Sequence, residues 1–326
     1  MKLVSLISGD RSIHVGALIE GRTPSENKIL DFHALEPKPE HEDMNEFIRK
    51  QNETLPWARA MIEKARAGLV PAQALTHESE TLLTAPVPHP VSCRDGYAFR
   101  QHVESARKGR GLPMIPEFDH FPIFYFTNHL AITGPGEIFV MEKALERLDF
   151  ELEVAVVIGK EGRNIPASKA DDYIFGYMIM NDWSARELQT QEMKLNLGPA
   201  KGKDFATSLG PYLVTRDELE SRLERGPHGD RYHLRMTAFH NGKQVSEGNL
   251  RDMNWTFAQI LERASYGVTL HPGEVIGSGT VGTGCYMELN LTTLKDQPVW
   301  IRPGDEFALE VEMLGRLENT IRKENP

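Results

Sequence analysis

The chain has 326 residues, of which 40% are hydrophobic and 26% charged, and its formal net charge is −10 at pH 7. This composition is that of a folded globular protein and excludes disorder for most of the chain, while the length allows one large domain and a small one. The acidic balance and the lack of a basic stripe argue against nucleic acid as a partner.

Cysteine content and hydropathy indicate the cellular compartment. The only two cysteines, Cys93 and Cys285, form no C-x-x-C pair. They cannot build a disulfide framework, which fits a reducing cytosol. No apolar run reaches the roughly 18 residues of a membrane span, and residues 3–7 are too short for the core of a signal peptide. We therefore expect a soluble, cytoplasmic protein without a membrane partner.

The first 84 residues predict a small β-rich domain. Residues 43–67 have helical spacing, and Pro56 is expected to divide them into two helices, the second beginning at the proline. Residues 81–90 hold three prolines in five residues, which indicates an extended linker. We place the boundary between domains 1–84 and 85–326 there. Three short strands are expected before the helices, at residues 3–7, 13–19 and 29–32.

Two apolar runs in the middle of the chain carry acidic residues at their ends. Residues 148–159 predict a buried strand in which Glu151 and Glu153 point to one face and the intervening apolar residues to the other. A solvated strand end is the plainer interpretation of Glu-x-Glu. The run 173–180, however, leads into Asp182 and brings a third carboxylate to the end of a core strand. Three such carboxylates are what a hard divalent cation such as Mg²⁺ or Ca²⁺ requires.

Helices and loops are expected on either side of these strands. The residues from Ala98 onward are expected to be helical, and residues 108–117 form a Gly- and Pro-rich loop expected to be mobile. Ser184 and Glu187 have the spacing of a capping box, which predicts a helix that starts just after Asp182.

The C-terminal half continues with loop, hairpin and strand signals. Arg186 and Gln189 are expected on one face of the first helical turn. Residues 194–211 indicate a loop, and residues 234–245 a hairpin with an Asn-Gly turn. Residues 255–263 predict an amphipathic helix. Strands are expected at residues 274–276, 287–291 and 307–313.

The segment Gly277-Ser278-Gly279-Thr280-Val281-Gly282 matches G-x-G-x-x-G. A dinucleotide-binding fingerprint requires a helix after the glycines. Residues 283–291 instead have the pattern of a strand, and we reject dinucleotide binding on that ground. A glycine-rich turn with exposed amides can still hold a carboxylate or enolate oxygen.

No nucleophile motif stands out. The chain has no G-x-S-x-G elbow and no evident Cys/His pairing, which leaves water as the nucleophile if the protein is a hydrolase. His102 taken alone is most simply a residue on a helix face. Glu288 lies between apolar residues in an expected strand. Were the two to meet, the carboxylate would make the imidazole a general base near neutral pH.

These residues resemble the fumarylacetoacetate hydrolase family. The resemblance spans about residues 85–320, and its Arg-Gln-His string is closer to fumarylacetoacetase than to the decarboxylase and isomerase branches. The chain is slightly longer than fumarylacetoacetase between Gln189 and Lys203, which leaves the substrate open. The matching strings are Asp95-x-Tyr97-x-x-Arg100-Gln101-His102, Glu151-x-Glu153, Asn181-Asp182-Trp183-Ser184-Ala185-Arg186-x-x-Gln189, Gly202-Lys203-x-Phe205, Ser278-Gly279-Thr280 and Met287-Glu288-Leu289.

The resemblance implies an α+β, β-rich fold, with a mixed β-roll domain behind a small N-terminal β-rich domain, usually as a homodimer. It implies that His102 is the general base and that Glu288 orients it. It places the ligands of a divalent metal (Mg²⁺ or Ca²⁺, with Mn²⁺ as an alternative) on Asp95, Glu151, Glu153 and Asp182. Substrate and oxyanion contacts fall on Tyr97, Arg186, Gln189, Lys203 and Thr280, and Tyr125 matches a further substrate-binding tyrosine.

The activity implied is metal-dependent hydrolysis of a carbon–carbon bond in a 1,3-diketone acid, either fumarylacetoacetate or a related acylpyruvate. A decarboxylase, dehydratase or isomerase of a 2-oxo acid on the same scaffold is the main alternative. A water-activating dyad of His102 and Glu288 argues against decarboxylation, because that reaction needs no activated water. A module that binds metal without turnover is less favoured, and a chance gathering of these polar residues is least favoured, at about one in twenty.

Overall fold

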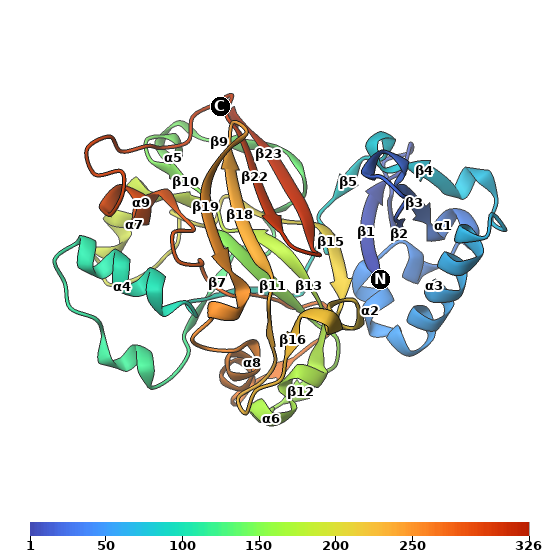
Figure 1. The fold of residues 1–326 in the computed structure, drawn as a ribbon, viewed down its shortest axis with the longest axis horizontal. Coiled ribbons are helices and arrows are strands. Elements are labelled where there is room, and N and C mark those ends of the chain that lie inside the picture. Colours follow the sequence, from blue (N-terminus) through green and yellow to red (C-terminus); the bar gives the residue numbers. More distant parts are fainter. Residues whose placement is uncertain (326) are drawn as a thin grey trace.

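The computed structural model describes residues 1–325 and has the α+β, β-rich architecture expected from the sequence. One mixed sheet runs from the N-terminal end of the molecule through its middle (Figure 1). The main path of this sheet is β4 (Leu75–His77), β3 (Lys28–Asp31), β2 (Ile13–Ile19), β1 (Lys2–Ile7), β15 (Thr207–Thr215), β13 (Ile174–Asn181), β11 (Leu152–Ile158), β21 (Val275–Gly277), β6 (Cys93–Gly96) and β7 (Phe124–Thr127). Off this path, β5 (Leu83–Thr84) pairs with β1, and β8 (Ile132–Thr133) with β15.

A second sheet packs in front of the central strands in Figure 1. Phe307 of this sheet lies 4.4 Å from Phe150 between ring centroids and 6.1 Å from Trp183, so aromatic side chains fill the space between the two layers. The strand order is β19 (Lys243–Asn249), β18 (Arg235–His240), β22 (Glu306–Val311), β23 (Gly315–Lys323) and β9 (Gly136–Val140). Three two-stranded pairs complete the β structure: β10 (Leu148–Asp149) with β14 (Ser184–Ala185), β12 (Gly162–Arg163) with β20 (Thr269–Leu270), and β16 (Leu223–Glu224) with β17 (Arg231–Tyr232).

The helices lie at the two ends and the lower edge of the molecule in Figure 1. The N-terminal end carries α1 (Phe32–Leu35), α2 (Met44–Arg49) and α3 (Gln51–Arg66). The opposite end carries α4 (Arg100–Gly109), α5 (Glu142–Leu145), α7 (Arg186–Met193) and α9 (Tyr286–Leu291), and the lower edge α6 (Ala167–Ala170) and α8 (Phe257–Ser265). None of the helices within residues 1–325 has the length and apolar character needed to cross a membrane.

The central strands are buried on both faces, which explains their near-continuous apolar sequence. In β11, Val154 and Val156 belong to the core between the two sheets, whereas Ala155 and Val157 belong to a second core that reaches the N-terminal helices. Strand alternation therefore holds as expected, and Glu153 shares the face of Ala155.

The N-terminal strands extend the large sheet, because β1 pairs antiparallel with β15. The segment expected to be an extended linker at residues 81–90 is instead tied into the fold. Its β5 pairs with β1, and Ala85 and Val87 are fully buried. The boundary at residue 84 stays a prediction.

Further predicted elements differ from the structure. The predicted loop 194–211 ends early, because residues 207–211 belong to β15. The break between α2 and α3 falls at Lys50, and Pro56 lies inside α3. Thr54 Oγ1 donates to the carbonyls of Phe47 (2.8 Å) and Lys50 (3.2 Å), which satisfies backbone acceptors at the end of α2. Pro56 lies further along α3, where it removes one backbone hydrogen bond, and the helix continues past it.

The capping box predicted at Ser184 does not form. Ser184 belongs to β14 and its Oγ donates to the carbonyl of Asp182 (2.9 Å), so α7 begins only at Arg186. The predicted strand 287–291 is also wrong, since these residues are helical in α9. Because a helix follows the glycines, the predicted strand is no longer an argument against dinucleotide binding. The strand topology is the remaining argument, because a dinucleotide-binding unit joins two parallel strands through one helix. The strand before the glycines, β21, is antiparallel to β11. It is parallel to β6, but the chain between β6 and β21 is not a single crossover helix.

Candidate active site

Four buried carboxyl groups meet where three central strands end. Asp95 lies in β6, Glu151 just before β11, Glu153 in β11 and Asp182 just after β13. Asp95 pairs with Gly277 of β21, and Leu152 with Asn181, so strand register brings these ends together. Carboxylate oxygens of Asp95, Glu151 and Glu153 lie within 4.8 Å of one another. Asp182, the fourth expected metal ligand, lies beside these three, because Lys203 Nζ contacts both Asp182 and Glu151.

Burial and mutual repulsion shift the proton affinities of this cluster. Burial raises the pKa of Asp95 from its usual 3.8 to about 7, and the neighbouring charge of Asp182 adds to the rise. Burial together with the charges of Asp95 and Glu151 holds the pKa of Glu153 well above its usual range. A carboxyl group with a raised pKa loses its proton only at a free-energy cost, unless a positive charge lies nearby.

Two buried cations offset part of this negative charge. Lys203 Nζ lies 2.5 Å from Glu151 Oε2 and 2.7 Å from Asp182 Oδ2. Arg186 Nη2 donates to Glu151 Oε1 at 2.7 Å, and its Nη1 to Gln189 Oε1 at 3.0 Å. Burial alone would raise the pKa of Glu151, but Lys203 and Arg186 together lower it to about 2. Glu151 is thus a fixed anion in the middle of the cluster.

The cluster fits a divalent cation. Glu153 Oε2 and Asp182 Oδ1 are buried and find no hydrogen-bond partner among residues 1–325. Buried polar atoms are rarely left in this state, and a bound ion is one of the few explanations. The donor set consists of carboxylate oxygens alone, which suits Mg²⁺, Ca²⁺ or Mn²⁺ better than softer metals.

The predicted dyad is formed between two helices. His102 of α4 and Glu288 of α9 lie with Nδ1 and Oε2 2.7 Å apart, and both side chains are almost fully buried. Glu288 Oε2 also accepts from the backbone N–H of Thr283 at 2.9 Å. The positive charge of a protonated His102 is close enough to lower the pKa of Glu151. The dyad and the carboxylate cluster therefore belong to one site.

The remaining predicted residues line the same site. Tyr97 packs edge-on against His102 with ring centroids 5.9 Å apart. Tyr125 donates a hydrogen bond from its hydroxyl to Asp182, and Thr280 Oγ1 donates to Glu153 at 3.4 Å. The structure thus brings all twelve predicted side chains together. Their roles stay predictions.

Sequence reasoning missed Asp149, a fully buried residue of β10. Its Oδ1 accepts from the backbone N–H of Tyr286 (2.6 Å), and its Oδ2 from that of Met287 (2.9 Å) and from Arg186 Nε (2.8 Å). Asp149 therefore fixes both the start of α9 and the guanidinium of Arg186. The signal was present, because Asp149, Glu151 and Glu153 follow the period of two that predicts a shared strand face.

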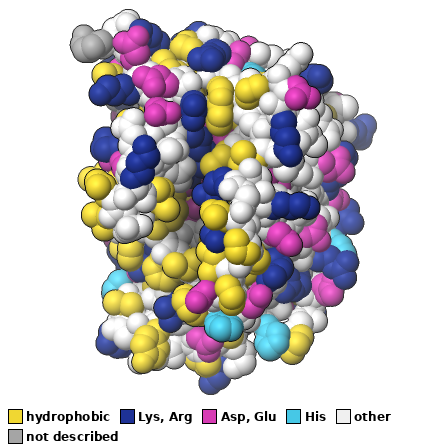
Figure 2. All heavy atoms as spheres, turned by 90° about the vertical axis from the view of Figure 1, so that its left-hand side faces the viewer, with side chains coloured by type: hydrophobic (Ala, Val, Ile, Leu, Met, Phe, Trp, Pro, Cys, Tyr) yellow, Lys and Arg dark blue, Asp and Glu magenta, His cyan; other side chains and the backbone are white. Residues whose placement is uncertain are grey.

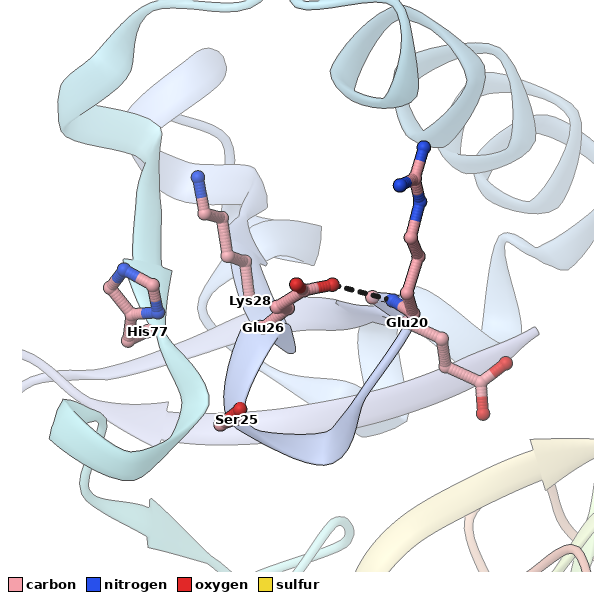
Figure 3. Close-up of a pocket in the computed structure, with 7 residues that line it drawn as sticks. Glu20, Ser25, Glu26, Lys28 and His77 are labelled. Carbon is pink, nitrogen blue, oxygen red and sulfur yellow. Dashed lines mark hydrogen bonds between the residues drawn. The ribbon is translucent and has the colours of Figure 1, made fainter.

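The end of the molecule that carries α4, α7 and α9 faces the viewer in Figure 2. Its middle is hollowed, and Lys and Arg side chains lie on both sides of the hollow. A rim of this sign attracts anionic small molecules. A different pocket lies on the N-terminal strands, where Glu20, Ser25, Glu26, Lys28 and His77 line it (Figure 3). All five are exposed, and the pocket contains no residue of the predicted site.

Comparisons with known proteins match most of the chain. The family model described as fumarylacetoacetate (FAA) hydrolase C-terminal matches residues 92–322. The oxaloacetate tautomerase YisK of Bacillus subtilis is 31% identical over 250 residues, which are 74% of this chain and 74% of that protein. The mitochondrial oxaloacetate tautomerase FAHD2A of Homo sapiens is 29% identical over 310 residues, covering 94% of this chain and 88% of that one.

Solved structures share the fold over the full length. The fumarylacetoacetate hydrolase of Exiguobacterium antarcticum superposes with a TM-score of 0.72 at 22% identity, covering 99% of this chain and 100% of that one. A maleylpyruvate hydrolase from Sphingobium gives a TM-score of 0.69 at 20% identity, with the same coverage. At these identities the likeness establishes the architecture.

Proposed function

Because the chain belongs to the fumarylacetoacetate hydrolase family, we propose that it is an enzyme that acts on the enol of a small 2-oxo dicarboxylic acid, with the keto–enol interconversion of oxaloacetate as its reaction. The observation that carries the proposal is the buried pair of His102 and Glu288 beside the carboxylate cluster. Relatives named as oxaloacetate tautomerases, which cover 74% and 94% of the chain, support this substrate class.

The dyad supplies the base. Glu288 accepts a hydrogen bond from His102 Nδ1, which leaves Nε2 of a neutral imidazole with a free lone pair. Nε2 takes a proton from C3 of the keto acid and returns it to the enolate oxygen, so that the enol forms without net gain or loss of atoms. Glu288 stabilises the imidazolium while it holds the proton, as a buried carboxylate next to a histidine does in other general-base sites.

The cations hold the substrate and its developing charge. Lys203 and Arg186 form ion pairs with Glu151, and Gln189 accepts a hydrogen bond from Arg186 Nη1. A prepositioned donor aimed at an enolate oxygen is typically worth about 3 kcal/mol of the barrier. Asp95, Glu151, Glu153 and Asp182 would hold the divalent cation, which when bound acts as a Lewis acid on the 2-oxo group.

Hydrolysis of a carbon–carbon bond is the second candidate, and the same dyad favours it. His102 Nε2 would take a proton from water, and the hydroxide would add to the acyl carbonyl of an acylpyruvate. Cleavage then gives a carboxylic acid and the enolate of pyruvate, which takes up the proton. The Arg100-Gln101-His102 string supports this branch, since it resembles fumarylacetoacetase. Homodimer formation and a cytoplasmic location stay predictions.

One set of assays separates the two candidates. Enol oxaloacetate, fumarylacetoacetate and several acylpyruvates would be followed by their ultraviolet absorbance, with added Mg²⁺ or Mn²⁺ and with EDTA. Metal-dependent acceleration of the enol-to-keto conversion without new products supports the tautomerase. Conversion of a diketone into two acids would replace it by the hydrolase, and release of CO₂ from oxaloacetate would move the protein to the decarboxylases.

A further inference from the structure

Cys285 lies inside the site but has no part in the proposed reaction. One ring nitrogen of His102, the Sγ of Cys285 and one carboxylate oxygen of Glu288 all lie within 4.8 Å of one another. The three side chains are 3%, 0% and 1% exposed. Cys285 is a free thiol at the N-cap of α9, where its Sγ accepts from the backbone N–H of Glu288 at 3.4 Å. A nitrogen, a sulfur and an oxygen ligand therefore converge from α4 and the start of α9.

This donor set differs in kind from the carboxylate cluster beside it. Imidazole, thiolate and carboxylate are the ligands that proteins use for Zn²⁺, and three of them leave a fourth position for water, as in catalytic zinc sites. Mg²⁺ and Ca²⁺ prefer oxygen ligands alone. The site thus holds two neighbouring ligand sets, one hard and one containing a soft sulfur, which select different metals.

We propose that His102, Cys285 and Glu288 form a second, inhibitory metal site that takes Zn²⁺. Ligation deprotonates the thiol, so one proton is released for each Zn²⁺ bound. The ion uses a nitrogen of His102 and the carboxylate that orients it, and the imidazole can then no longer accept a proton from the substrate. Binding depends only on the three ligands, whereas inhibition rests on the proposed role of His102 as the base.

Binding requires the ligand atoms of His102 and Glu288 to move slightly apart, and Cys285 Sγ, which lies within 4.8 Å of both residues, to move closer to them. Bond lengths of about 2.0–2.2 Å to nitrogen and oxygen in a tetrahedral site separate two such ligands by roughly 3.4 Å. His102 Nδ1 and Glu288 Oε2 are now 2.7 Å apart, so the imidazole must withdraw by less than an ångström. The N–H of Thr283, 2.9 Å from the same carboxylate oxygen, anchors Glu288 meanwhile.

The first experiment measures binding without any substrate. Full-length protein would be saturated with Mg²⁺ and dialysed against Zn²⁺, and in parallel loaded with Co²⁺ as a spectroscopic probe. We expect one Zn²⁺ per chain and a thiolate-to-Co²⁺ charge-transfer band in the near ultraviolet. Cys285→Ser should lose the band and bind Zn²⁺ at least tenfold more weakly. Cys93→Ser, which removes the other buried free thiol, is the matched control. It should keep the charge-transfer band and bind Zn²⁺ as strongly as the wild type.

Two further results decide where the ion sits. Glu153→Gln removes a ligand of the carboxylate cluster only, and it should leave the Co²⁺ band unchanged. Absence of a thiolate band in the wild-type protein, or equal Zn²⁺ binding by wild type and Cys285→Ser, would overturn the proposal, because the ion would then occupy the carboxylate cluster. The wild-type spectrum decides this even if a cysteine variant fails to fold.

The second experiment measures inhibition, with each variant compared with its own zinc-free activity. Micromolar Zn²⁺ added to the Mg²⁺-saturated enzyme should inhibit the wild type and Cys93→Ser, and inhibit Cys285→Ser at least tenfold less. Zinc bound through the thiol without inhibition would refute the inhibitory role and also count against His102 as the base. A protein that turns over none of the tested acids would fail the proposed function, while the Co²⁺ band would still test the metal site.

Discussion

The two halves of the candidate site are built on different supports. The residues of the carboxylate cluster lie in or next to β6, β11 and β13 of the large sheet, and each of these strands pairs with a strand on both sides. The dyad joins a ten-residue helix to a six-residue helix. Among residues 1–325 the cluster has buried oxygens without hydrogen-bond partners, whereas His102 and Glu288 bond to each other. The half on strands is electrostatically incomplete and fits a cation, whereas the half on short helices already holds a buried hydrogen-bonded pair.

Replacing His102 by Ala should produce the largest difference between the two halves, because it should lower kcat and leave metal binding intact. Loss of a positioned general base typically costs about 100-fold to 10,000-fold in rate, and we expect kcat to fall by that much with the best 2-oxo acid. Metal binding, measured by equilibrium dialysis, should survive, because His102 is not in the carboxylate cluster. Loss of the metal along with activity would refute the division of roles.

Glu288→Gln tests whether the dyad acts as a unit. Because the proposed role of Glu288 is only to orient and stabilise the imidazole, its replacement should lower kcat less than His102→Ala does. Residues that act together are not additive, so the double variant should be no slower than His102→Ala alone. Additive losses in stopped-flow rates would mean that Glu288 acts independently of His102.

The carboxylate half predicts opposite outcomes for two neighbouring glutamates. Glu153→Gln should lose about 100-fold in metal affinity, yet in EDTA it should melt no lower than the wild type, because burial and its neighbours already disfavour the Glu153 anion. Glu151→Gln should melt lower in EDTA, because Lys203 and Arg186 each lose one of their two carboxylate partners, and Asp182 and Asp149 alone remain. Thermal melts with and without Mg²⁺ compare the two, and equal melting temperatures in EDTA would contradict the difference in their surroundings.

The strand half could be predicted from sequence because period two is a local property. The apolar run after Glu151 fixed the shared face of the two glutamates, and the run before Asp182 placed that carboxylate at a strand end. Strand register brought them together, since Leu152 pairs with Asn181. The resemblance to a family supplied the partners that lie far apart in the chain, namely Lys203 and Asp95.

The helical half could not be predicted in the same way. Residues 287–291 read as a strand because Met287, Leu289 and Leu291 alternate with polar residues. The helix forms because Asp149, 137 residues away from Tyr286, accepts two N–H groups of its first turn. Such a cap is a tertiary contact and leaves no local signal. At Ser184 the local capping signal was present, but the side chain bonds to the carbonyl of Asp182 instead.

Asp149 joins the two halves, and Asp149→Asn tests that link. The amide keeps one acceptor but loses the charge that holds Arg186 and the N-terminus of α9. We expect a loss of about 2 kcal/mol in unfolding free energy and a roughly tenfold fall in kcat from misplacement of Glu288. Mg²⁺ affinity should stay within about twofold, since Asp149 is no ligand. The exposed Asp172→Asn is the matched control, and an equal loss of Mg²⁺ affinity and kcat would contradict the link.

A pH effect on stability, with no effect on rate required, distinguishes the halves without any change of substrate. Burial raises the pKa of Asp95 from 3.8 to about 7 in the folded protein without metal. Between these two pH values, Asp95 therefore keeps its proton in the folded chain and has lost it in the unfolded chain. Stability is therefore highest at the acidic end of this window and falls as pH rises to about 7, by at most about 1.4 kcal/mol per pH unit. Saturating Mg²⁺ requires the ionised carboxylates and should remove or reverse the slope. Denaturant unfolding across this range measures it. Asp95→Asn should reduce the slope in EDTA but leave the part that Glu153 contributes, because the pKa of Glu153 is also raised. An unchanged slope in this variant would mean that Asp95 does not contribute to the pH dependence.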